Sequence, residues 1–226
     1  MKLETTVIPP ATMPNGLQGT KDGLWVCDQA TDDLYLLNRE LKLVKTLTTT
    51  AENSSGLTVG GDSFWIGSNG ASDARYPRPT DSGFSGVIQC DYETGEEISR
   101  FPTPDGGGIH GVEWIDGLIW ITAFKPKALI LIDPADGSVI RKFEVDHERL
   151  HGLAVENNGI WCAHTSDKII IKYELDTGKE LDRIVYNDSD PAPHGFTTWE
   201  GELWSCDANW PSPIHPDGPS ISKIIR

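Results

Sequence analysis

The sequence has no long apolar run, and none of its segments approaches the roughly 18 consecutive apolar residues that a membrane helix needs. Residues 1–7 read MKLETTV and contain no apolar segment typical of a secretory signal, so we expect no export. Hydrophobic residues still make up 38% of the 226 positions, and eight residues are tryptophan. The composition therefore predicts a soluble chain with a substantial hydrophobic core.

Cysteine is scarce, and the four cysteines stand singly at positions 27, 90, 162 and 206. No C-x-x-C spacing occurs, which excludes the usual cysteine zinc motifs and a small disulfide-rich frame. Three of the four follow a tryptophan by one or two residues, a position that favours a small buried thiol. We therefore expect a reducing compartment, the cytoplasm.

Positive charge is also scarce, with 19 Lys and Arg against 34 Asp and Glu and a formal net charge of −15. Nucleic acids and anionic membranes attract clusters of Lys and Arg, so we expect neither as a partner. Extended 3.6-residue periodicity is missing, and so are the G-x-S-x-G, P-loop and H-E-x-x-H motifs. The missing helical periodicity favours an all-β chain. Because the common catalytic motifs are missing too, other residues must indicate its function.

What the sequence does contain is a repeat. A His-Gly-apolar triplet occurs at 110–112, 151–153 and 194–196, and the same frame without histidine occurs at 15–17 and 55–57. Each copy leads, after nine or ten residues, to an apolar residue and a tryptophan. The tryptophans at 25, 65, 120, 161 and 204 are spaced by 40, 55, 41 and 43 residues, and the glycines of the triplets have the same spacings. Five copies of a unit of about 40 residues are therefore present.

Each unit reads as four short strands. In the fourth unit the strands are expected at 153–155, 160–163, 168–173 and 181–185, with turns at 157–159 and 176–178. Four strands repeating at this period are typical of a β-propeller blade. We predict an all-β, five-bladed β-propeller of four-stranded antiparallel blades, a single domain over 1–226, with blades near 10–50, 51–104, 105–146, 147–189 and 190–226 plus 1–9.

The ends of the chain should close the ring. The fifth unit stops after its third strand at 220–225, and residues 3–9 precede the first unit as a spare strand. We expect this N-terminal strand to complete the last blade and to leave no long exposed edge. Cys27 and Cys206 occupy equivalent positions in neighbouring units of such a ring, so a disulfide between them stays open. A closed ring can act alone, and we expect a monomer.

Two stretches break the period, at 68–86 in the second unit and at 207–219 in the fifth. Both are rich in turn-forming residues and lie between the second and third strands of their units. On a propeller these loops emerge on the face where the innermost strands begin. We expect both to overhang that face.

The residue before each repeat glycine begins an innermost strand, so these five residues should ring the channel mouth: Asn15, Ser55, His110, His151 and His194. A wider ring is expected three residues after each tryptophan: Asp28, Ser68, Ala123, His164 and Asp207. Converging imidazoles with nearby carboxylates suit a divalent metal (Mg, Mn or another transition metal) or acid–base chemistry. The predicted metal ligands are His110, His151, His194, His164 and Asp28. A histidine before glycine can also simply cap a turn, and this alternative stays open.

Other residues over this face are candidates for binding a small-molecule substrate, together with Asn15 and Ser55: Arg75, Tyr76, Lys125, Trp210 and His215. A solvated loop explains the basic ones equally well. Glu113, in the first strand of unit three, is a further candidate for the channel.

The repeat resembles the blade of the streptogramin lyases, the virginiamycin B lyase family. The resemblance is carried by the three His-Gly triplets with the pairs Ile119-Trp120, Ile160-Trp161 and Leu203-Trp204. That family opens a cyclic depsipeptide by elimination across an ester, using Mg, a histidine of a His-Gly segment and a Glu three residues after a repeat tryptophan. The matching positions here are His194 and Asp207, so the acid is Asp, and the ring has five blades where the family has seven.

The resemblance implies a metal-dependent lyase acting on a small cyclic, lactone-like or carboxylated substrate. His194 or His151 would be the base, and Asp207 would orient an imidazole or a metal-bound water. A metal-dependent lactonase and a non-catalytic binding propeller are the alternatives.

Overall fold

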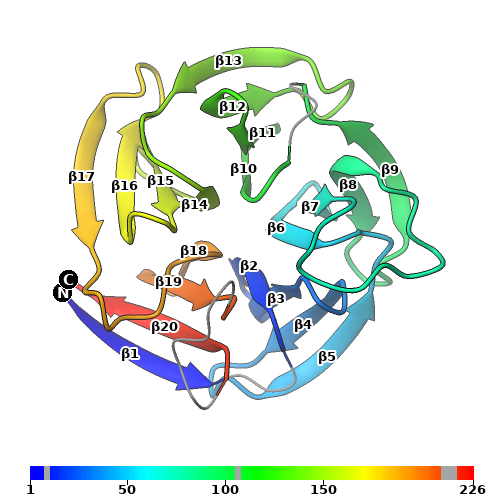
Figure 1. The fold of residues 1–226 in the computed structure, drawn as a ribbon, viewed down its shortest axis with the longest axis horizontal. Helices are drawn as coiled ribbons and strands as arrows, with labels where there is room; N and C mark the ends of the chain where they lie inside the picture. The colour runs from blue at the N-terminus through cyan, green and yellow to red at the C-terminus, as the bar shows by residue number, and fades with distance from the viewer. Residues whose placement is uncertain (8–10, 105–107, 210–217) are drawn as a thin grey trace.

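The computed structural model confirms the predicted fold. It describes residues 1–7, 11–104, 108–209 and 218–226, and these form five four-stranded antiparallel sheets around a central axis (Figure 1). No helix occurs in the described residues, and none could therefore span a membrane. The architecture is an all-β, five-bladed propeller.

The first two blades comprise β2 (Pro14–Thr20), β3 (Gly23–Asp28), β4 (Asp33–Leu37) and β5 (Leu43–Thr48), then β6 (Ser54–Gly60), β7 (Ser63–Asn69), β8 (Ser85–Asp91) and β9 (Glu97–Pro102). The next two comprise β10 (Val112–Ile115), β11 (Leu118–Phe124), β12 (Lys127–Ile132) and β13 (Val139–Glu144), then β14 (Leu150–Glu156), β15 (Gly159–His164), β16 (Ile169–Glu174) and β17 (Glu180–Val185). The fifth comprises β18 (Phe196–Trp199), β19 (Glu202–Asp207), β20 (Ser220–Ile225) and β1 (Lys2–Val7).

The N-terminal strand closes the ring as predicted. β1 pairs antiparallel with β20 from Lys2 opposite Ile225 to Val7 opposite Ser220, and the two chain ends lie side by side in Figure 1. A side-chain hydrogen bond of 2.9 Å joins Thr5 to Ser222. The last sheet thus has four strands, three from the C-terminal part of the chain and one from its N-terminus.

The repeat glycines allow the innermost strands to approach closely. A Cβ atom on Gly152 would lie 2.2 Å from the backbone nitrogen of Phe196 in the next blade, and one on Gly111 would lie 2.1 Å from the carbonyl oxygen of His151. Only glycine fits such a contact without moving the neighbouring strand. The glycine of the triplet therefore serves the packing of blades around the axis.

Four of the five repeat tryptophans are buried as expected, and Trp204 is half-buried. The cores lie between neighbouring blades; Trp120, for example, packs in a cluster that joins blades three and four. All four cysteines are buried and free, so Cys27 and Cys206 form no disulfide. Burial raises the pKa of each of these thiols well above its usual value.

The insertion of the second unit joins β7 to β8 and is held to blade one by ion pairs. The Arg75 guanidinium lies 3.0 Å from Asp32 and 2.8 Å from Asp81, and the side chains of Arg75 and Asp32 are 6% and 0% exposed. Arg78 lies 3.0 Å from the same Asp32 oxygen. Part of the second excursion, with Trp210 and His215, lies outside the described residues.

Candidate functional site

Three histidine rings meet where the innermost strands begin. The ring centroids of His110 and His151 are 4.3 Å apart, and those of His151 and His194 are 4.7 Å apart. His151 is thus the middle ring, and Phe124 stacks on His110 at 4.6 Å. We call His110, His151 and His194 the imidazole cluster.

The hydrogen bonds of the cluster set the tautomer of its middle ring. The Nδ1 atom of His151 lies 3.2 Å from the amide oxygen of Asn15, whose amide nitrogen donates to Gln29 at 2.6 Å. The Nδ1 atom of His194 lies 3.1 Å from the carbonyl oxygen of Ala192. A carbonyl oxygen only accepts hydrogen bonds, so we assign the proton of His151 to Nδ1, and its Nε2 atom then carries a lone pair. The Nδ1 atom of His194 faces both an acceptor, the Ala192 carbonyl, and a donor, the Ala208 backbone nitrogen at 3.4 Å.

One nitrogen of each ring in the cluster has no partner among the described residues. The Nε2 atoms of His151 and His194 and the Nδ1 atom of His110 are all buried and make no hydrogen bond. His151 and His194 are 0% exposed, whereas His110 is half-buried. A buried polar atom without a partner is uncommon and needs an explanation, and a bound ligand is one.

Burial keeps all three imidazoles neutral. Desolvation lowers the pKa of His110 to about 3, aided by the nearby charge of Arg149, and lowers the pKa of His194 to about 4. The pKa of His151 falls well below its ordinary value for the same reason, with the other two rings and Arg149 contributing. The cluster therefore presents unprotonated nitrogens at neutral pH.

Arg149 is a residue of this site that the sequence reasoning missed. It directly precedes β14 and acts electrostatically on all three rings. The other four units carry Met13, Asn53, Gly108 and Ala192 at the same place, so Arg149 is the one cation at this position of the repeat. This difference from the other units is the signal in the sequence by which Arg149 could have been identified.

The predicted outer ring supports the loops at the mouth. Asp28 accepts hydrogen bonds from the backbone nitrogens of Met13 at 3.2 Å and Ala30 at 2.8 Å. His164 pairs through Nε2 with the Tyr173 hydroxyl at 2.9 Å. Asp207 lies 3.8 Å from Nδ1 of His194 and accepts from the backbone of Asn209 at 2.9 Å. Of these contacts, the one between Asp28 and Met13 holds a segment that leads into an innermost strand.

The five predicted metal ligands lie in different surroundings. No group of three or more His, Cys, Asp or Glu side chains among them converges in a way that could hold one. Of the five predicted ligands, Asp28 already serves backbone amides and His164 serves Tyr173, while His110, His151 and His194 lie together. A divalent metal ion at this site stays a prediction.

The structure places the predicted substrate-binding residues in different surroundings. Arg75 is engaged by two aspartates, Tyr76 is 94% exposed, and Lys125 is exposed on the turn after Phe124. Ser55 is buried and donates to the carbonyl oxygen of Ile109, so it braces the mouth alongside Asn15.

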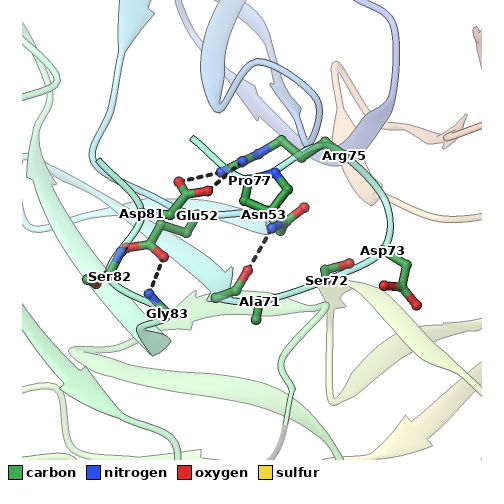
Figure 2. A pocket seen from close by; sticks show the side chains of 11 residues that line it. Glu52, Asn53, Ala71, Ser72, Asp73, Arg75, Pro77, Asp81, Ser82 and Gly83 are labelled. Carbon is green, nitrogen blue, oxygen red and sulfur yellow. Dashed lines mark hydrogen bonds and ion pairs between the residues drawn. The ribbon is translucent and has the colours of Figure 1, made fainter. Parts of the chain in front are cut away.

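A cavity of about 530 Å³ lies at the insertion (Figure 2). Its wall includes Arg75 and Asp81, and the Glu52 carboxylate within it accepts hydrogen bonds from the backbone of Ser82 and Gly83 at 2.8 and 2.7 Å. Its described lining contains no imidazole, so this cavity is separate from the cluster.

Glu113 lies between blades further along the channel. Its carboxylate accepts a hydrogen bond of 3.0 Å from the backbone nitrogen of Val155 and lies 3.5 Å from the Thr58 hydroxyl. Burial raises its pKa to about 8. Apolar residues and glycines of the innermost strands, such as Gly56, Val112 and Phe196, leave no room for a water-sized molecule between them.

No protein-family model and no curated protein sequence matches the chain. Solved structures do match. A glutaminyl cyclase from Myxococcus xanthus shares 12% identity and a TM-score of 0.70, over 98% of this chain and 95% of that one. What is shared is the β-propeller fold.

Two other structures place the chain among propellers of different activities. Catalytically inactive virginiamycin B lyase from Staphylococcus aureus with quinupristin shares 15% identity and a TM-score of 0.55, over 97% of this chain and 69% of the lyase. The Pan2 WD40 domain of Neurospora crassa shares 11% identity and a TM-score of 0.53, over 86% and 56%. At these identities the likeness shows the fold and leaves activity to the site.

Proposed function

We propose that the protein is a lyase that removes a proton beside a carbonyl group of a small molecule and eliminates an oxygen leaving group. The observation that carries this proposal is the imidazole cluster, with three neutral rings that each have a buried nitrogen without a partner in the described residues. His110 is the half-buried member, so a substrate at the mouth reaches it first.

The chemistry needs a base and a positive charge. An unprotonated imidazole takes the proton from carbon, the carbon–oxygen bond breaks, and the leaving oxygen takes the proton back from the imidazolium. The intermediate negative charge on the carbonyl oxygen is stabilised by a nearby cation, and Arg149 supplies one. The amide oxygen of Asn15 holds His151 with its Nε2 lone pair turned away from Asn15.

A second candidate is an intramolecular cyclisation that releases ammonia. The match to the glutaminyl cyclase favours it, because that match spans nearly the whole of both chains, while the lyase extends well beyond this one. Proton transfer by a neutral imidazole serves this reaction too.

The test is a panel of β-acyloxy and β-hydroxy carbonyl compounds, with quinupristin included, followed by ultraviolet absorbance of the new conjugated double bond. His110→Gln should lower kcat/KM about a hundredfold or more, the range typical of a lost general base. His147→Gln is the matched control, because His147 pairs with Asp167 outside the imidazole cluster.

Ammonia release from peptides with N-terminal glutamine, without a new absorbance, would replace the lyase by the cyclase. If neither product forms, and a His110/His151/His194 triple variant binds compounds of the panel with the same affinity as the unaltered protein, both enzyme proposals fail and a binding propeller remains.

A further inference from the structure

Arg149 begins the segment that carries the middle ring of the imidazole cluster. It lies immediately before β14 with a left-handed backbone, φ 48°, and its carbonyl oxygen accepts a hydrogen bond of 3.1 Å from the backbone nitrogen of Thr165. His151 follows two residues later. The backbone that aims the arginine is thus the backbone that positions the middle ring.

The guanidinium has no counter-ion among the described residues. No salt bridge and no side-chain hydrogen bond joins it to another described group, although the chain carries 34 acidic residues. Arg75, Arg141 and Arg183, by contrast, each pair with an aspartate or glutamate at 3.0 Å or less. Arg149 is half-buried, and desolvation lowers its pKa. A partly buried and unpaired cation favours an anion beside it.

The same site offers a hydrogen-bond acceptor. The Nε2 atom of His151 lies in a ring that is 0% exposed, carries a lone pair and has no donor among the described residues. A ligand that satisfies the site therefore brings a negative group for the arginine and an N–H or O–H donor for the imidazoles.

We infer that Arg149 binds the carboxylate of a small substrate whose neighbouring hydroxyl or amino group donates to the imidazole cluster. This makes Arg149 a specificity-determining residue, and the substrate class a hydroxy or amino carboxylate. That this ligand is a substrate rests on the proposed function. Binding of a carboxylate by Arg149 does not rest on it, because binding is measured without turnover.

Four matched probes test the inference: lactate, alanine, propionate and lactamide, each titrated into the full-length protein while the NMR signals of the histidine rings are followed. Lactate or alanine should bind more tightly than propionate, and whichever of the two binds better identifies the donor. Lactamide, which keeps the hydroxyl but lacks the charge, should bind about tenfold to a hundredfold more weakly than lactate.

Arg149→Gln should weaken binding of the carboxylates by a similar factor, and Arg149→Lys should restore part of it. Arg141→Gln is the matched control, because that arginine is exposed on β13 and pairs with Asp176 in the turn after β16. Equal binding of lactate and lactamide by the unaltered protein would overturn the inference, even if Arg149→Gln failed to fold. Carboxylate binding by a folded Arg149→Gln variant at unaltered affinity would overturn it too.

The outcomes separate this inference from the proposed function. Arg149-dependent carboxylate binding with no turnover in the lyase and cyclase assays leaves the anion site and removes the enzyme. Turnover together with carboxylate binding that does not depend on Arg149 would keep the enzyme and remove the anion site.

Discussion

At the scale of single residues, position in the repeat identified the imidazoles but not their neighbours. Residues before equivalent glycines must lie at equivalent points of a ring, so His110, His151 and His194 could be placed together from spacing alone. Asp28 could not be assigned, because its oxygens turn back to loop amides whose conformation no spacing encodes. Arg149 was missed for a similar reason, since its left-handed backbone falls outside the strand pattern.

Glu113 gives a pH-dependent prediction at this scale. Its pKa is raised in the folded protein to about 8, so the folded state binds more protons than the unfolded state between the two pKa values. The stabilisation that Glu113 contributes is fully present below the pKa that it has in the unfolded chain. This stabilisation is lost as the pH rises through the folded-state pKa of about 8. Glu113→Gln, which stays neutral, should therefore have a higher Tm than the unaltered protein at pH 9 and a similar one at pH 5.

Thermal unfolding at both pH values measures this difference, with Glu40→Gln as the exposed control. If Glu113→Gln lowered the Tm equally at pH 5 and pH 9, the carboxyl would be ionised throughout and the prediction would be wrong.

At the scale of elements, the strands could be predicted from turn signals and alternation. The turn at Asn157 and Asn158 joins β14 to β15 as expected, and Asn157 has the positive φ of 53° that such a turn uses. The insertion was located by its broken period, but its anchoring was not foreseen. Arg75 was expected to face a ligand, and instead it joins Asp32 of blade one to Asp81 of its own loop.

This anchoring predicts a large effect of Arg75→Gln on stability. The change leaves the Asp32 carboxylate, which is 0% exposed, with only the partly exposed Arg78 as a cation. Breaking a buried ion pair from one side is strongly destabilising, and we expect a loss of about 3 kcal/mol in the free energy of unfolding. Urea unfolding measures it.

Tyr76→Ala is the control for the same loop, because that side chain is 94% exposed and its removal should change stability little. Similar unfolding curves for the two variants would mean that the ion pairs contribute nothing measurable.

At the scale of the whole molecule, the ring is closed by one strand pair. Deleting residues 1–7 removes β1 and exposes the paired edge of β20 over its whole length. We expect a markedly lower Tm and association at high protein concentration, because an unpaired edge strand recruits other chains. Calorimetry and light scattering measure the two effects, and deletion of Met1 alone, which lies outside the strand, is the control. An unchanged Tm would show that the closure is dispensable.

The pairing of β1 with β20 also has a consequence for biosynthesis. Thr5 meets Ser222 across a sequence separation of 217 residues, so a ribosome must make four complete blades after β1 before its partner exists. Until then the nascent chain carries a solitary strand and an open arc of blades. Such species are prone to misassembly, and we expect the pairing of β20 with β1 to be the rate-limiting step of folding.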